Sequence, residues 1–239
     1  MARRGALLLM LMLGTLTLGA QAPARQATGE PKITWYFYTV KWGFQDEFMD
    51  LFQRNHYPLL KAHVKRHGPL SLIHFDAHSD TWNDAAGTGR VDHGTMFYHA
   101  AREGLVDPKA SVQIGLRTHN DDLMGFNVLD AAWVHEHGAQ AAAAEARRIV
   151  GRHKAYLTFD IDCLDPAFAP GTGTPVAGGL SSAQALAILK GLAGTDFVGM
   201  DVVEVAPAYD VGDITSLAAA HLAHEWLALY AAGKLSPPA

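Results

Sequence analysis

The chain of 239 residues lacks several features that would place it in a special class of protein. It has one cysteine, Cys163, so no disulfide can form within the chain and the fold does not depend on an oxidising compartment. It has no basic excess, since its formal net charge is −5, and we therefore expect no nucleic-acid partner. It also lacks an apolar run of the roughly 20 residues that a membrane-spanning helix needs. What remains is a globular composition with enough apolar residues for a substantial core.

The N-terminal part differs from the rest. Arg3 and Arg4 precede an apolar run over residues 6–18, and small residues follow at 20–22, which is typical of a secretory signal peptide. The predicted organisation is a signal-like segment at 1–22, a linker and unassigned aromatic-rich segment at 23–57, and a globular domain at 58–239. We expect no membrane contact in the mature form.

From Pro58 onward, short apolar runs alternate with helical stretches. The predicted strands are 71–75, 112–116, 155–159 and 198–203. The predicted helices are about 58–67, 96–104, 139–152, 181–192 and 213–231, with Ser181 or Ser182 capping the fourth. Near-continuous apolar strands indicate a sheet that is buried on both faces. The alternation therefore predicts an α/β fold, with three αβα layers and a mostly parallel sheet.

Charged groups directly follow the predicted strands. Asp76, Arg117, Asp160 and Glu204 each come immediately after one of the four apolar runs. In open α/β sheets, ligands bind outside the carboxyl ends of the strands. The sequence therefore predicts a site at this edge of the sheet.

Five acidic and imidazole residues at this edge form two short motifs. Asp76, His78 and Asp80 alternate in one motif, and Asp160 and Asp162 alternate in the other, so each set points to one side of an extended segment. Either motif alone is equally well explained as turn chemistry. Four carboxylates at one edge, however, would repel unless cations lie between them. Carboxylates with an imidazole suit Mn²⁺, and two carboxylate pairs suit a site for two metal ions.

Several longer motifs occur in a characteristic order. They are Asp-Ala-His-Ser-Asp at 76–80, His-Gly-Thr at 93–95, Phe-Asp-Ile-Asp-Cys-Leu-Asp-Pro at 159–166 and Val-Glu-Val-Ala-Pro at 203–207. In these motifs and their order the chain resembles the ureohydrolase family, which includes arginases and agmatinases. The residues of the motifs are most similar to those of the agmatinase branch. The similarity runs from about Pro58 to about Tyr230. The resemblance implies an arginase-like fold and a catalytic domain at 58–239.

The resemblance also implies a metal centre with two Mn²⁺ ions per chain. Asp76 and Asp160 match the bridging carboxylates of the family. Asp80 would complete the first metal site, and His78 with Asp162 would complete the second. Such a centre supplies a water-derived nucleophile at neutral pH, which the delocalised guanidinium carbon requires.

Two further residues match catalytic positions of the family. Glu204 resembles the carboxylate that binds the planar guanidinium through paired hydrogen bonds. His93 resembles the histidine that transfers a proton to or from the leaving amine. Without the resemblance, His93 would also fit as a histidine at a helix entry, and Glu204 as a salt-bridged residue at a strand end.

The chain departs from the family upstream of Pro58. The Gly-Gly-Asp-His segment, whose histidine is the remaining ligand of the first metal, is absent, and the equivalent position falls on Gln53 or, with a short deletion, on His56. We name His56 as the candidate ligand and expect an N-terminally truncated fold. A divergent periplasmic form, a wrong start or rearranged gene, and a weakly active relative all fit this departure. The signal-like segment favours a periplasmic or secreted location, and the resemblance favours the cytoplasm.

The expected substrate is a small guanidino compound. Residues 81–92 lack the pattern with which arginases bind the amino-acid end of arginine, so agmatine is expected, with putrescine and urea as products, a step of polyamine metabolism. Arg90 would instead favour a carboxylate tail, as in 4-guanidinobutyrate. The resemblance also implies a homotrimer or homohexamer.

Two functions of other classes stay open. One is a catalytically impaired relative that only binds, for which one metal ion or none is expected. The other is a deacetylase with a single Zn²⁺, which would not need both Asp80 and Asp162.

Overall fold

The computed structural model describes residues 61, 64–66, 68–83 and 92–235. The predicted segments 1–22 and 23–57, with His56 and Gln53, lie outside the described residues, and so does Arg90. The five described strands form one sheet in the order β3-β2-β1-β4-β5, in which every neighbouring pair is parallel. They are β1 (Ser71–Phe75), β2 (Val112–Ile114), β3 (Asn127–Leu129), β4 (Ala155–Asp160) and β5 (Phe197–Val203).

The four predicted strands are confirmed, and β1 has the predicted bounds. Strand β3 was not predicted, because it is three residues long and its first two residues are only half-buried, so it has little apolar pattern. The register aligns the carboxyl ends of the central strands, since Phe75 of β1 pairs with Ile114 of β2 and with Phe159 of β4. The residues that follow Phe75 and Phe159 are therefore brought to one edge.

The described helices that follow β1 are α3 (Met96–Arg102), α4 (Ala131–His137), α5 (Ala139–Val150), α6 (Ser182–Gly191) and α7 (Ile214–Leu235). Helix α6 begins as predicted, because the Ser181 hydroxyl accepts from the N–H of Gln184 and the Gln184 side chain accepts from the N–H of Ser181. Helix α4 was not predicted. Residues 61 and 64–66 are helical, in agreement with the predicted helix at 58–67.

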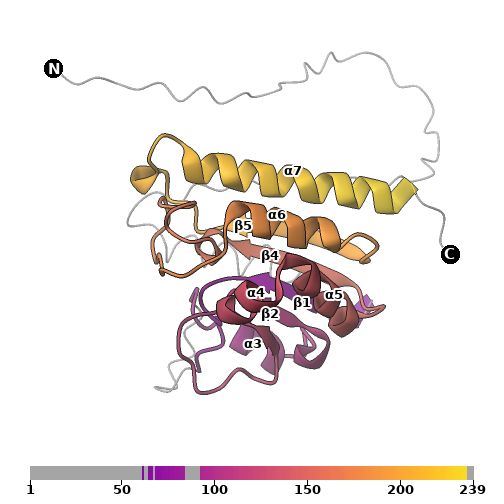
Figure 1. The fold of residues 1–239 in the computed structure, drawn as a ribbon. Coiled ribbons are helices and arrows are strands. Elements are labelled where there is room, and N and C mark those ends of the chain that lie inside the picture. The colour runs from indigo at the N-terminus through magenta and orange to yellow at the C-terminus, as the bar shows by residue number, and fades with distance from the viewer. Residues whose placement is uncertain (1–60, 62–63, 67, 84–91, 236–239) are drawn as a thin grey trace, which may run out of the picture. The chain divides into compact units, whose positions relative to one another are not determined.

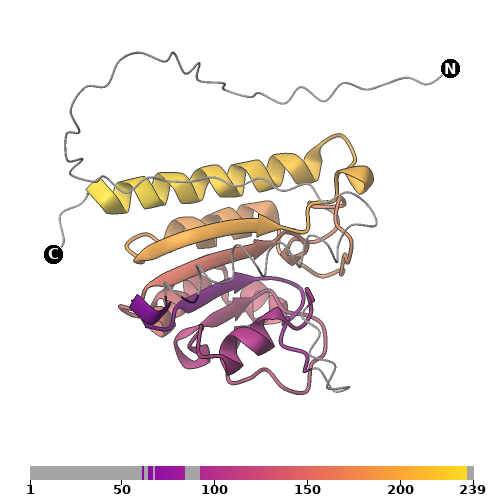
Figure 2. The same ribbon diagram turned by 180° about the vertical axis from the view of Figure 1, so that it is seen from behind.

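Alternation along the strands divides the core between the two faces of the sheet. Ile73 and Phe75 belong to the larger cluster, which includes the buried residues of α5 and α6. Leu72 belongs to a smaller cluster with Phe97 of α3. Figure 1 shows α5 and α6 against one face, and Figure 2 shows α3 on the opposite side. The predicted α/β architecture with a parallel sheet is thus confirmed.

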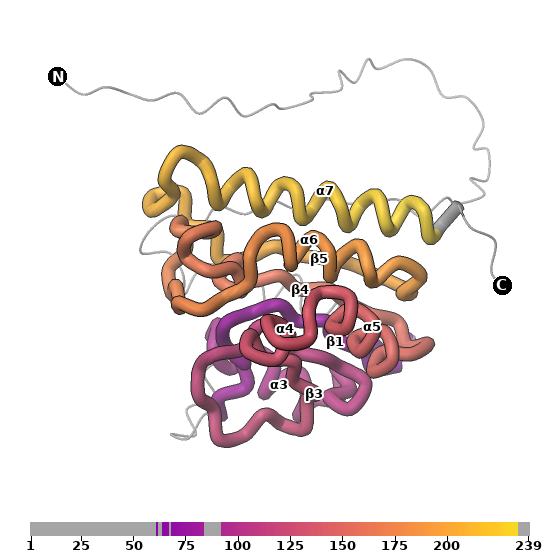
Figure 3. The backbone as a smooth tube through the Cα atoms, in the orientation of Figure 1, coloured from indigo at the N-terminus to yellow at the C-terminus, as the bar shows by residue number. Residues whose placement is uncertain are grey.

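The last helix extends along the edge of the sheet that β5 forms. Helix α7 lies beside α6 and β5, as the tube in Figure 3 makes clear. Trp226 of α7 contacts Phe197 of β5 edge-to-face, with ring centroids 6.0 Å apart. In the described part of the chain, no helix has both the length and the apolar character needed to cross a membrane.

Candidate metal centre

The turns after β1 and β4 bring buried carboxylates together. Asp76 follows β1 directly, Asp160 ends β4, and Asp162 lies in the short 3₁₀ turn Ile161–Cys163 that follows. Their exposed fractions are 1%, 6% and 0%. Asp80 is almost as well buried, and its positive φ of 52° is uncommon for a residue other than glycine. Such a backbone is kept where the surroundings enforce it, and here the N–H of Phe97 donates to the Asp80 carbonyl at 3.0 Å.

Hydrogen bonds hold these side chains in place. One Asp76 oxygen, Oδ1, accepts from the backbone N–H of His78 at 2.6 Å, and Oδ2 lies 2.7 Å from Nε2 of His74. Asp162 Oδ1 accepts from the N–H of Ala77, and its Oδ2 accepts from the hydroxyl of Thr174. The carboxylates are therefore oriented before any ligand binds.

Two groups of potential metal ligands share Asp76. The first consists of His74, Asp76 and Asp80, and the second of Asp76, His78 and Asp162, with the ligand atoms of each group within 4.8 Å of one another. Four of the predicted ligands are thus brought together. Asp160 belongs to neither group, and its Oδ1 instead accepts from the N–H of Asp162 at 2.9 Å.

The buried carboxyl groups of this site favour the binding of a cation. Burial and the neighbouring Asp76 raise the pKa of Asp80 to about 7. Burial, with Asp76 and Asp162 nearby, raises the pKa of Asp160 to about 11. A buried carboxylate that cannot ionise beside others becomes a good ligand once a metal ion supplies positive charge. The donor set of carboxylate oxygens and imidazole nitrogen fits Mn²⁺.

A cavity of about 260 Å³ opens over these residues. Its lining consists of His78, Asp80, Trp82, Asp92, His93, Gly94, Asp160 and Thr174. His93 lies in the turn before α3 and is exposed, so a proton on its imidazole can exchange with water. The predicted residues Asp80, Asp160 and His93 therefore face one space of a size that suits a small molecule.

Glu204 lies outside this lining among the described residues. It follows β5, has a positive φ of 62° and is exposed. Its Oε2 lies near Gly173, where a Cβ would be 3.9 Å from this oxygen. Partial desolvation raises the pKa of Glu204, while the nearby His93 lowers it. The structure thus places Glu204 beside the loop that carries Thr174, and close enough to His93 and Asp162 for their charges to act on its pKa.

The sequence motifs did not identify His74, Gln113, Thr174 or the role of Arg117. His74 and Gln113 are polar residues inside the apolar strands β1 and β2, and this contrast is the signal that could have revealed them. The guanidinium of Arg117 donates to five backbone carbonyls, including that of Asp162 at 2.6 Å.

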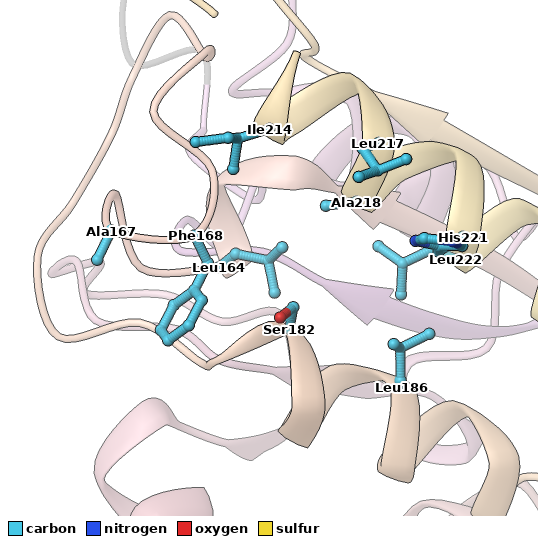
Figure 4. Close-up of a pocket in the computed structure, with 10 residues that line it drawn as sticks. All are labelled: Leu164, Ala167, Phe168, Ser182, Leu186, Ile214, Leu217, Ala218, His221 and Leu222. Atoms are coloured by element: carbon cyan, nitrogen blue, oxygen red, sulfur yellow. The ribbon is translucent and has the colours of Figure 1, made fainter. Parts of the chain in front are cut away.

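A second hollow, of about 240 Å³, lies between α6, α7 and the turn at 164–168. Figure 4 shows that apolar side chains such as Leu164, Phe168 and Leu217 surround it. Among the described residues, Ser182 and His221 are its polar lining residues, and none of the lining side chains is a carboxylate. This described lining therefore lacks the ligands that a metal ion or a guanidinium group needs.

Comparison with known proteins agrees with this geometry. A model of the arginase family matches residues 54–228. Agmatinases from Chromobacterium violaceum and Edwardsiella ictaluri are 59% and 60% identical over 174 and 177 residues. These matches cover 72% and 74% of this chain but 54% and 57% of the relatives, so the chain spans little more than half of their length.

Solved structures give the same result. A hypothetical agmatinase from Burkholderia thailandensis matches with a TM-score of 0.72 and 66% identity, over 75% of this chain and 57% of that one. The proclavaminate amidino hydrolase of Streptomyces clavuligerus matches with a TM-score of 0.69 and 46% identity, over 73% and 60% of the two chains. The predicted resemblance is thereby confirmed.

Proposed function

The chain belongs to the arginase family, and we propose that it hydrolyses agmatine to putrescine and urea with two Mn²⁺ ions. The observation that carries the proposal is Asp76, whose carboxylate is grouped with Asp80 on one side and with His78 and Asp162 on the other. A shared carboxylate is what a site for two neighbouring metal ions requires. The names of the similar proteins support agmatine as the substrate.

The proposed metal ligands are Asp76, His78, Asp80, Asp160 and Asp162. Bound metal ions would lower the pKa of water and so provide a nucleophile at neutral pH. The outcome is one C–N bond cleaved by one water molecule, which leaves urea and the free amine. His56 stays the predicted further ligand, and it lies outside the described residues.

His93 and Glu204 are the proposed catalytic residues. His93 lies on the cavity wall and is exposed, so it can deliver a proton to the departing amine nitrogen and regain one from solvent. Glu204 would bind the guanidinium with its two oxygens from the side of Gly173. The distal end of agmatine would extend along Trp82, whose ring can attract a cation.

A urea-release assay on the purified full chain tests the proposal. The substrates are agmatine, arginine and 4-guanidinobutyrate, each with Mn²⁺ and with Zn²⁺. We expect Mn²⁺-dependent urea release from agmatine and none from Asp76→Asn. The matched control is Asp196→Asn, which removes an exposed ion pair with Lys154 at the other end of β4 and β5 and is expected to retain activity.

Each alternative has its own outcome. Urea release from 4-guanidinobutyrate in preference to agmatine would identify a guanidinobutyrase. Binding of one Mn²⁺ or none, with no urea from any substrate, would identify an impaired binding protein. Hydrolysis of an acetylated amine with Zn²⁺ would identify a deacetylase. The trimer or hexamer stays a prediction, which the molar mass in solution would test.

A further inference from the structure

Two buried polar side chains lie behind the metal ligands. His74 of β1 and Gln113 of β2 are neighbours in the sheet register and have exposed fractions of 1% and 0%. The residues flanking them in sequence, such as Ile73 and Ile114, are apolar and point to the opposite face. Burying polar groups costs free energy unless their hydrogen bonds are satisfied, so the contacts of this pair need an account.

The amide group of Gln113 contacts both the turn after β1 and the side chain of His74. Its Nε2 donates to the carbonyl oxygen of Ser79 at 2.6 Å and lies 3.1 Å from Nδ1 of His74. An amide nitrogen can only donate, and it has two hydrogens, so both contacts are satisfied when Nδ1 of His74 accepts. Nε2 of His74 then carries the hydrogen that is donated to Asp76 Oδ2 at 2.7 Å.

We propose that Gln113 and His74 are positioning residues that fix the ligand loop Asp76–Asp80. Gln113 holds this loop at Ser79 directly and at Asp76 through His74. The inference rests on the proposed function, since it concerns the same metal centre. It assigns a purpose to a glutamine in the middle of a buried strand, which does not line the cavity.

The arrangement leaves Asp76 free to bind metal. Oδ1 accepts from the backbone N–H of His78 and also lies 3.3 Å from Nδ1 of the same residue, whereas Oδ2 accepts from His74. A carboxylate oxygen has a second lone pair, and that of Oδ2 stays available. The loop also bonds at its other side, where Asn120 donates to the hydroxyls of Ser79 and Thr81. The Gln113 contact therefore adds a buried side-chain tie to the backbone bond by which the N–H of Asp76 donates to Ile114 of β2.

Loss of such a supporting hydrogen bond lowers metal affinity by about ten- to a hundredfold in other metal sites. We expect this loss of Mn²⁺ affinity in Gln113→Met, which keeps the side-chain length but has no N–H. We expect the same in His74→Met. His74→Gln restores an N–H donor and should recover most of the affinity.

The matched control is Asn127→Leu in β3. The amide of Asn127, like that of Gln113, makes two hydrogen bonds, here to the backbone carbonyls of Lys109 and Ser111, but away from the site. This variant should bind Mn²⁺ like the parent. Melting temperatures of the metal-free proteins show whether each variant is folded.

The readouts are Mn²⁺ binding isotherms and the visible absorption of the Co²⁺-loaded protein, which reports ligand geometry without substrate. Parent affinity and an unchanged Co²⁺ spectrum in Gln113→Met would overturn the inference. If His74→Met, but not Gln113→Met, binds one ion fewer at saturating Mn²⁺, His74 is itself a metal ligand and the inference is wrong for this residue. If the parent binds Mn²⁺ but releases no urea, the proposed function fails, while the expected loss in Gln113→Met still supports the positioning role.

Discussion

Nδ1 of His78 lies 3.1 Å from Oδ2 of Asp162, and this contact joins the turn after β1 to the turn after β4. Oδ1 of the same carboxylate accepts from the backbone N–H of Ala77 at 3.1 Å. Hydrogen bonds to Asp162 and Asp76 raise the pKa of His78 to about 10. A proton therefore occupies the place between imidazole and carboxylate that a metal ion would take.

Replacing Asp162 by asparagine tests this relationship. Asp162→Asn keeps the shape of the side chain but removes the charge. Residues that only orient metal ligands change metal affinity by about ten- to a hundredfold, and we expect the variant to lose more Mn²⁺ affinity than that. Metal content after dialysis, measured by elemental analysis, gives the answer. Asp196→Asn is the control and should keep its metal. Two tightly bound Mn²⁺ ions in Asp162→Asn would contradict a ligand role for Asp162.

Removal of metal should destabilise the fold. Burial and neighbouring carboxylates raise the pKa values of Asp80 and Asp160, so these groups ionise only at a cost in free energy when no cation is present. Mn²⁺ at about 100 times its dissociation constant adds about 2.7 kcal/mol to the free energy of unfolding. For a domain of this size that is roughly 5–11 °C in melting temperature.

Thermal melting with EDTA, and again after Mn²⁺ is added back in excess, measures the effect. An equal concentration of sodium chloride in place of Mn²⁺ is the control for ionic strength. Identical melting temperatures in EDTA and in Mn²⁺ would mean that the carboxylates do not hold a metal ion.

Most of the sheet could be predicted from the sequence because its strands are buried on both faces. Strand β1 is a continuous run of five buried residues, so its bounds are clear from the sequence. The short strand β3 and the helix α4 were not predicted, because Asn127 and Asp130 are residues that are common in polar loops. The side chain of Asp130 is in fact the N-cap of α4 and accepts from the N–H of Trp133.

The proximity of the candidate site residues was predictable where they belong to local motifs. Asp76 and His78 are two residues apart, so their proximity follows from the backbone. Gln113 could not be assigned in this way, because its contact with Ser79 depends on the pairing of β1 with β2. The approach of Glu204 to His93 and Asp162 likewise depends on tertiary structure, because these residues are far apart in the sequence.

Arg117 should be a major source of stability for the ligand turns. Its guanidinium donates to the carbonyls of Gly115, Asp162, Cys163, Leu164 and Val176. Leaving such carbonyls unpaired costs about 1–3 kcal/mol each, without full additivity. We expect Arg117→Met to lose about 2–4 kcal/mol, and Arg117→Lys to recover only part, since lysine lacks the planar fork.

Urea denaturation in EDTA measures this loss without a contribution from metal binding. The control is Arg152→Met, because Arg152 is exposed and its replacement should change stability by no more than about 0.5 kcal/mol. A midpoint for Arg117→Met equal to that of the parent would show that the carbonyls are satisfied in another way.

The first turn of α7 depends on Asp210. Its Oδ1 accepts from the N–H of Thr215 at 2.9 Å, and its Oδ2 accepts from the N–H and the hydroxyl of Ser216 at 2.9 and 2.8 Å. Burial raises the pKa of Asp210, but these hydrogen bonds outweigh it and lower the pKa to about 2. Since an aspartate in the unfolded chain has a pKa of about 3.9, the ionised form is favoured by folding.

Asp210→Asn should therefore have a pH-dependent effect on stability. Because the folded pKa is depressed, the carboxylate contributes fully above about pH 4, and its contribution disappears as the pH falls from about 4 towards 2. We expect the variant to be about 1 kcal/mol less stable than the parent at pH 6, with a smaller difference at pH 3. Urea unfolding of both proteins at a series of pH values measures this. Asp213→Asn, nearby and exposed, is the control, and a deficit in Asp210→Asn that is the same at every pH would show that the charge of Asp210 is not its cause.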